Sequence, residues 1–100
     1  EASTPAGPWL VTDAEPGRIT CTVDGETMQD SHVCELVFSP VDLVVYISAI
    51  VTLAPGDLIL TGTPGGVGAG RTPPRFLAAG QEVVTAVEGI GECRNVCVVG

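Results

Sequence analysis

The sequence contains four cysteines and one histidine, the residue types best suited to metal binding or thiol chemistry. Cys93 and Cys97 have three residues between them, and Cys21 and Cys34 have twelve. Neither pair has the Cys-x-x-Cys spacing typical of structural zinc, for which His32 would be the spare ligand. All four cysteines lie in apolar or alternating stretches, where a free cysteine acts as a small core residue. The sequence therefore favours reduced structural thiols over disulfides or a metal site.

A glycine-rich segment, residues 61–70, could hold an anion with its backbone amides. From Gly65 the chain approaches the phosphate-binding G-x-x-x-x-G-K-[ST] pattern, with Arg71 in the place of the lysine. Arginine does not replace the compact lysine ammonium. Pro73 and Pro74 also stand where that motif opens into a helix, and they lack backbone donors. Nucleotide binding is therefore disfavoured.

Other candidate chemistry is sparse. His32 has no obvious acidic partner in the sequence and is interpreted as a solvated or satisfied side chain. Asp13 with Glu15, or Asp24 with Glu26, could bind a cation through oxygen, although acids are also common in turns. The chain has no lysine, which excludes Schiff-base chemistry, and no G-x-S-x-G nucleophile motif.

Alternating apolar and polar residues predict the strands that position these groups. The expected strand ranges are 18–23, 26–29, 58–60, 82–88 and 92–99. Asp24-Gly25 is a typical dipeptide for a tight hairpin turn between the first two strands. The strand over 58–60 would lead directly into the glycine-rich segment.

One helix is predicted, over residues 40–50. Ser39 at the N-cap, Pro40 at the first position and Asp42 three residues after the cap form a helix start. The segment is apolar on nearly all sides, which predicts a buried helix. The expected fold class is mainly β with one buried helix (α+β), in a single domain over residues 1–100.

Composition narrows the possible partners. The 100 residues carry 12 acidic and 4 basic side chains, a net charge of −8, so no basic patch is available for nucleic acid. No apolar run approaches the ~20 residues that a membrane-spanning helix needs. Without an obvious disulfide framework, the expected location is the cytoplasm.

The order of several segments resembles the fumarylacetoacetate hydrolase family. These segments are GPWLVT, VDGETMQD, FSPVDLVVYIS, LAPGDLILTGTPGGVG, RTPPRFLAAGQEV and EGIGECRNVCV. The resemblance spans residues 7–98, is most specific over 55–68, and corresponds to the C-terminal half of the family's catalytic domain. It implies part of a mixed β-roll, a divalent metal (Mg or Mn), and a homodimer or other homo-oligomer. It also implies hydrolysis, decarboxylation or isomerisation of β-diketo acids, acylpyruvates or related dioates, as in aromatic catabolism, through a metal-stabilised enolate.

The same resemblance implies that Thr63 and Gly62 contact a small keto-acid substrate. The family's metal ligands, an E-x-E pair followed by an aspartate, lie upstream of GPW, as do its lid histidine–glutamate pair and a lysine. This chain contains no E-x-E and no lysine, so no catalytic or metal-ligating residue is assigned. Whether the chain is itself an enzyme stays open. The alternative is a catalytically inactive, truncated homologue that acts as a binding or oligomerising module.

Overall fold

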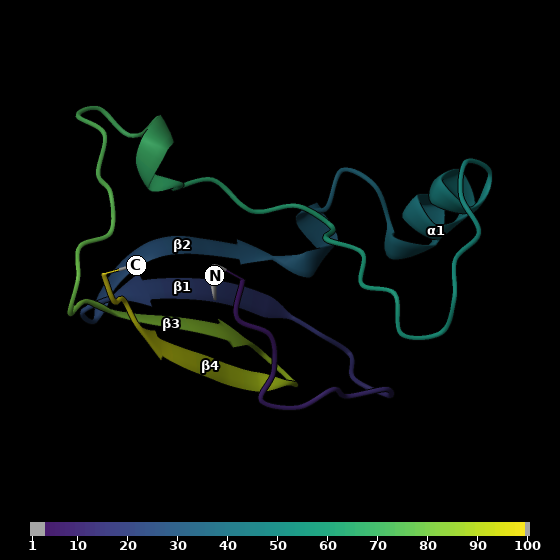
Figure 1. Ribbon diagram of the computed structural model, residues 1–100, viewed down its shortest axis with the longest axis horizontal. Helices are drawn as coiled ribbons and strands as arrows, with labels where there is room; N and C mark the ends of the chain where they lie inside the picture. The colour runs from purple at the N-terminus through teal and green to yellow at the C-terminus, as the bar shows by residue number, and fades with distance from the viewer. Residues whose placement is uncertain (1–3, 100) are drawn as a thin grey trace.

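A computed structural model describes residues 4–99. Its centre is a four-stranded antiparallel sheet with the order β2-β1-β3-β4, accompanied by one α-helix and two 3-10 turns (Figure 1). The strands are β1 (Arg18–Val23), β2 (Glu26–His32), β3 (Glu82–Val87) and β4 (Gly91–Val96). This arrangement confirms a mainly β fold with one helix.

The hairpin of β1 and β2 closes at the predicted turn. Asp24 and Gly25 both have positive φ, 50° and 82°, which the tight hairpin turn requires. The register then shifts between Cys21 and Thr22, so that Met28 has no partner in the pairing of β1 with β2. Beyond this bulge the pairing continues to His32, so β2 is longer than the expected strand over 26–29.

The second hairpin, β3 with β4, is also the predicted one, although β4 ends at Val96 instead of residue 99. Trp9 from the entry segment donates a hydrogen bond from Nε1 to the Ile90 carbonyl in the connecting turn, at 3.0 Å. On its other edge β3 pairs with β1, so two strands that are distant in sequence form the middle of the sheet.

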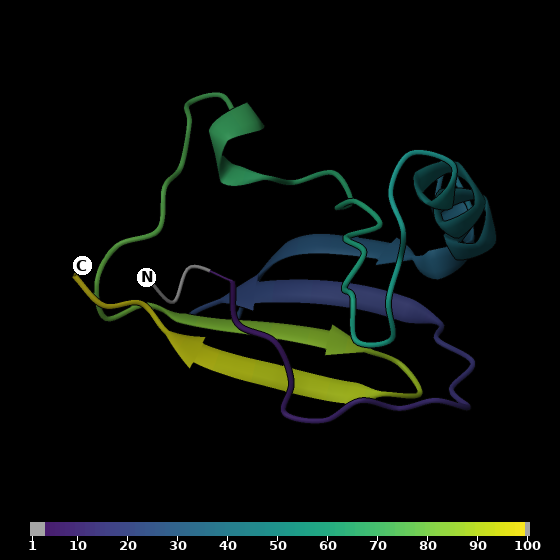
Figure 2. The same ribbon diagram turned by 45° about the vertical axis from the view of Figure 1, so that its right-hand side comes forward.

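The predicted strand over 58–60 is wrong. Leu58 and Leu60 are exposed, at 77% and 82%, and this segment pairs with none of the described strands. Its apolar residues match the strand pattern, but a strand exists only where a neighbour completes its hydrogen bonds. The segment instead belongs to the long connection, residues 49–81, that carries the chain from α1 back past β2 to the start of β3 (Figures 1 and 2).

The helix α1 (Pro40–Ser48) begins as predicted and ends two residues before the expected position 50. Ser39 accepts a hydrogen bond from the Asp42 backbone, and the Asp42 side chain accepts one from the Ser39 backbone, which completes a capping box. The expected burial of this helix is wrong, because α1 contains no buried residue. It lies beside the sheet (Figure 1), and most of its apolar side chains are exposed.

The described part of the chain has almost no closed core. Val23 is its one buried hydrophobic residue, at 5% exposure. Large apolar side chains on α1, on the segment that follows it and near the C-terminus are exposed instead. Within residues 4–99, no helix is both long and apolar enough to cross a membrane.

Candidate functional site

The glycine-rich segment is attached to the sheet through Gln29 of β2. The Gln29 side-chain nitrogen donates to the Thr63 hydroxyl at 2.9 Å and to the Pro64 carbonyl at 2.7 Å. Gln29 is half-buried, whereas Thr63 is exposed. A single strand residue therefore fixes the place of Thr63, the threonine expected to contact a substrate.

A second attachment comes from Arg71. Its Nε donates to the Gly66 carbonyl at 3.1 Å, and its Nη2 donates to the Met28 carbonyl at 2.8 Å. Met28 is the bulged residue of β2, so the irregularity in the strand meets the loop. The Arg71 guanidinium, which stands in the lysine position of the phosphate-binding pattern, thus binds backbone carbonyls. Where that pattern would open into a helix, the chain has only the short 3-10 turn η2 (Gly68–Gly70).

The backbones of the loop and β2 are in direct contact at Gly66. This residue has a φ of +106°, and an added Cβ would lie 2.1 Å from the Met28 carbonyl oxygen. Gly68 is equally confined, because its Cβ would lie 1.9 Å from the Arg75 carbonyl oxygen. Only glycine fits these two positions, which explains part of the glycine content of the segment.

Gly62 and Thr63 line a small cavity of about 200 Å³. One wall is apolar and comes from Leu36, Val37 and Phe38. The remaining lining includes side chains of the β2 end and of η1 (Val33–Glu35), namely Ser31, His32, Val33 and Glu35. Gly62 has a φ of +121° and no atom within 4 Å of an added Cβ, so its backbone is open to a bound molecule.

Thr63 also lines a larger cavity of about 630 Å³. This cavity contains Gln29 and two cationic side chains, Arg71 and Arg75. Arg75 forms an ion pair with Glu26 at 2.8 Å. Thr63 therefore belongs to the common wall of two cavities, one with an apolar side and one with arginines.

The polar end of the smaller cavity is an ordered cap. His32 Nδ1 accepts a hydrogen bond from the Cys34 backbone at 3.2 Å. Glu35 accepts hydrogen bonds from the Ser31 hydroxyl and from the His32 backbone, and the Ser31 bond is the main reason that the pKa of Glu35 lies below its usual value. The interpretation of His32 as a satisfied side chain agrees with this cap.

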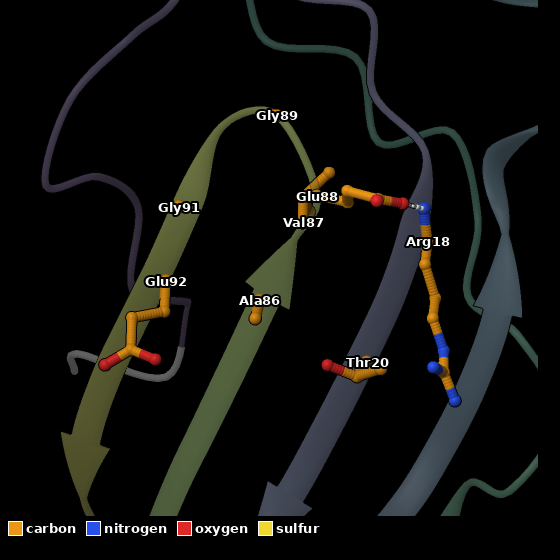
Figure 3. A pocket seen from close by; sticks show the side chains of 8 residues that line it. All are labelled: Arg18, Thr20, Ala86, Val87, Glu88, Gly89, Gly91 and Glu92. Atoms are coloured by element: carbon orange, nitrogen blue, oxygen red, sulfur yellow. Dashed lines mark hydrogen bonds between the residues drawn. The ribbon is translucent and has the colours of Figure 1, made fainter.

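A third cavity, of about 470 Å³, lies between the start of β1 and the β3–β4 hairpin (Figure 3). Glu88 reaches across it and accepts a hydrogen bond from the Arg18 backbone nitrogen at 3.0 Å. The Arg18 guanidinium instead pairs with Asp30 on β2, with Nε 2.6 Å from Oδ1. These charged groups hold the ends of the strands together, and the cavity contains no predicted site residue.

The proposed cation ligands are dispersed or already engaged. Asp24 accepts from the Glu82 backbone at 2.8 Å and from Gln81 at 2.9 Å, while Glu26 pairs with Arg75. Among residues 4–99, no three His, Cys, Asp or Glu side chains gather in a way that could hold a metal ion. The donor groups that are described therefore do not fit a divalent metal.

All four cysteines are free thiols, the state that the sequence favoured. Cys21 and Cys93 are half-buried within the sheet, whereas Cys34 is exposed, so the expectation of a core position is wrong for Cys34. Burial raises the pKa of the Cys21 thiol and so disfavours its thiolate form.

The sheet and its attached loop define a small β domain that presents one threonine to two cavities. The sequence matches the family described as fumarylacetoacetate (FAA) hydrolase C-terminal over residues 1–98. The chain therefore belongs to the fumarylacetoacetate hydrolase family. This result confirms the resemblance expected from the PGDLILTGTPGGVG block.

Curated relatives include the mitochondrial oxaloacetate tautomerase FAHD2A of Bos taurus, which is 48% identical over 96 residues. The alignment covers 91% of this chain and 31% of that protein. The chain thus spans about a third of the length of the curated relatives that it matches.

Solved structures share the fold. The 5-carboxymethyl-2-hydroxymuconate delta-isomerase of Mycobacterium smegmatis is 41% identical, with a TM-score of 0.81 over 92% of this chain and 35% of that chain. The fumarylpyruvate hydrolase of Pseudomonas aeruginosa, in complex with Mn²⁺ and pyruvate, is 33% identical, with a TM-score of 0.74 over 85% and 34%. Hydrolases and isomerases thus both occur among the similar structures.

Sequence reasoning did not assign a role to Gln29. Its one signal was its position in the VDGETMQD segment that carries the resemblance. The contact with Thr63 joins residues 34 positions apart, and it exists because the loop returns along β2. A local pattern does not contain that information.

Proposed function

We propose that this chain provides the substrate-binding loop of an enzyme that hydrolyses, decarboxylates or isomerises β-diketo acids, acylpyruvates or related dioates. Thr63 and Gly62 are the proposed substrate contacts. The observation that carries the proposal is the placement of Thr63: an exposed hydroxyl, held by Gln29, between two cavities. The names of the relatives, an oxaloacetate tautomerase and a fumarylpyruvate hydrolase, support a small keto acid as the substrate.

The two contacts would play different parts. The Thr63 hydroxyl hydrogen-bonds an oxygen of the keto acid and fixes its orientation. Gly62 lets the ligand approach the backbone, since no side chain stands in the way. The apolar wall of Leu36, Val37 and Phe38 would exclude water from the non-polar part of the ligand.

A divalent cation, Mg or Mn, is proposed for the complete family domain, where it would stabilise an enolate. Support comes from the Mn²⁺ in the fumarylpyruvate hydrolase and from the resemblance, which places the metal ligands upstream of GPW. The donor groups of residues 4–99 do not form such a site. No step through the metal is therefore assigned to residues of this chain.

A second candidate function is an oligomerising module. The exposed apolar side chains of α1 and of the segment that follows it favour this reading, because such surfaces are normally covered by a partner. A second copy of the chain, in a homo-oligomer, is the proposed partner. Both functions are compatible, because the surface and the Thr63 site involve different residues.

The proposed location is the cytoplasm, as the sequence predicted from its cysteines. The name of the bovine relative places that protein in mitochondria. Fractionation of cells that produce the full-length protein would decide between the two compartments.

The function is tested by titrating the chain with sodium pyruvate, the ligand of the fumarylpyruvate hydrolase structure, and following backbone amide resonances by NMR. We expect Thr63→Val, which removes the hydroxyl and keeps the shape, to weaken binding roughly threefold to tenfold, the range of one hydrogen bond. Thr63→Ser keeps the hydroxyl and is expected to bind within about twofold of the unmodified chain. Equal binding by Thr63→Val would contradict the substrate-contact role.

A further inference from the structure

The side-chain amide of Gln29 has only one possible orientation. Its nitrogen lies 2.7 Å from the Pro64 carbonyl oxygen, which can only accept a hydrogen bond. If the amide were turned by 180°, two acceptor oxygens would face each other at this distance. The NH₂ group must therefore be the part of the amide that faces the loop.

This orientation decides the direction of the second hydrogen bond. The same nitrogen lies 2.9 Å from the Thr63 hydroxyl oxygen, and an amide nitrogen can only donate. The Thr63 oxygen is thus the acceptor, and its own hydrogen is not used by Gln29. Within residues 4–99, no protein group accepts that hydrogen, so it is free to be donated to a ligand.

We propose that Gln29 is a positioning residue, which holds the Thr63 oxygen and leaves its hydrogen free, and so favours a ligand with an acceptor oxygen at this point. The inference rests on the proposed function, because it assumes that the ligand meets Thr63. It adds the chemical class of the group that binds there. A carboxylate or a keto oxygen, which offers only lone pairs, can accept the free Thr63 hydrogen.

Gln29 is well placed to fix this geometry. It lies inside β2, paired with Cys21 and next to the bulge at Met28. An added Cβ on Gly66 would lie 3.3 Å from the Gln29 Cγ, which shows that the loop closes over the stem of the side chain. The amide is therefore held by the strand on one side and by the loop on the other, as a preorganised contact requires.

The test compares two replacements of Gln29 in the pyruvate titration. Gln29→Glu keeps the shape, but the introduced carboxylate only accepts, so the Thr63 hydrogen turns toward it and is lost to the ligand. Gln29→Met removes both hydrogen bonds and leaves the Thr63 hydrogen free. We expect Gln29→Glu to weaken binding roughly threefold to tenfold and Gln29→Met to weaken it less. The new carboxylate also faces the Pro64 carbonyl oxygen, so a second comparison in a Thr63→Val background is needed to isolate the effect on the hydroxyl.

A double-mutant cycle separates this effect from simple charge repulsion. In a Thr63→Val background there is no hydroxyl to turn and only the repulsion between the new carboxylate and the Pro64 carbonyl remains, so we expect Gln29→Glu to weaken pyruvate binding less than it does in the unmodified chain. An equal loss in both backgrounds would show that the new charge repels the ligand directly, and would overturn the inference. Wild-type affinity in Gln29→Glu would overturn it as well.

A second measurement needs no ligand. The two Nε2 hydrogens of Gln29 give separate NMR resonances, and we expect Thr63→Val to shift one of them while the other, bonded to Pro64, stays. An unchanged pair of resonances would overturn the inference. If the unmodified chain fails to bind pyruvate, the proposed function fails, and the amide resonances alone decide the role of Gln29.

Discussion

At the scale of single residues, side-chain amides and carboxylates do most of the positioning in this chain. Asp24 shows which part of this positioning can be predicted from the sequence. Its place in an Asp-Gly hairpin turn was predictable, and its positive φ of 50° confirms it. Its second role was not, because its carboxylate also accepts hydrogen bonds from Gln81 and from the Glu82 backbone, some 57 residues away.

The Asp24 carboxylate makes the stability of the sheet depend on pH. The Glu82 backbone bond, followed by the Gln81 bond, holds the pKa of Asp24 below its ordinary value. A carboxyl with a lowered folded-state pKa stabilises the fold above its unfolded pKa of about 3.9, and this contribution is lost as the pH falls through the folded value. Asp30, held by Arg18, and Glu35, held by Ser31, act in the same direction.

We therefore expect the urea midpoint of unfolding to fall as the pH is lowered from about 5 to about 2. Trp9, the single tryptophan, contacts the β3–β4 turn and supplies the fluorescence signal. Asp24→Asn keeps an acceptor and tolerates positive φ, so it is expected to show a shallower loss at acid pH. The same slope in both proteins would contradict the role of the Asp24 carboxylate.

At the scale of elements, the glycine-rich loop and the bulged strand β2 form one unit. Two side chains, Gln29 and Arg71, connect them, and at Gly66 the backbones touch. The sequence indicated a glycine loop after an apolar segment, but two local patterns cannot state which strand the loop will contact. The bulge at Met28, which supplies an acceptor for Arg71, could not be predicted from the sequence for the same reason.

Gly66→Ala tests this unit. A Cβ at φ +106° is strained, at a cost of order 1–3 kcal/mol, and it would also strike the Met28 carbonyl. We expect the loop to leave β2, so that the Gln29 side-chain resonances take the values of an exposed amide and pyruvate binding is lost.

Gly65→Ala is the matched control. Gly65 has no neighbouring atom within 4 Å of an added Cβ, and its φ lies outside the positive range, so the loop should stay in place. Similar spectra for the two variants would show that the loop does not depend on the contact at Gly66.

The helix α1 shows a different limit of sequence reasoning. Its cap, its proline and its start were predictable, because they depend on residues within one turn. Its burial was not predictable. An apolar sequence indicates that the helix needs a covering surface, but it does not show that the chain provides one. In this chain Leu43 and Ile47 are half-buried, and the other apolar side chains of α1 are exposed.

At the scale of the whole molecule, the chain is more extended than a closed domain of its length. Its radius of gyration is 15.1 Å, against about 13 Å for a compact domain of 100 residues. The helix α1 and the long connection after it stand away from the sheet (Figure 2), and many of their apolar side chains are exposed. Surfaces of this kind favour association with a partner.

We expect the chain to self-associate in a concentration-dependent way in sedimentation velocity experiments. Val45 is 64% exposed on α1, and Val45→Ser is expected to raise the dimer Kd roughly tenfold, because a symmetric interface loses the side chain twice. Ala79→Ser, at an exposed position away from α1, should leave the Kd unchanged. A monomer at all concentrations would contradict the oligomerising module.

The most direct test of the central claim is the map of amide shifts during the pyruvate titration. We expect the largest changes to fall on Gly62 and Thr63, with smaller ones at Gln29, and we expect Thr63→Val to reduce them. Changes centred on the cavity beside Glu88, or the same map in Thr63→Val, would contradict the assignment of the glycine-rich loop as the substrate contact.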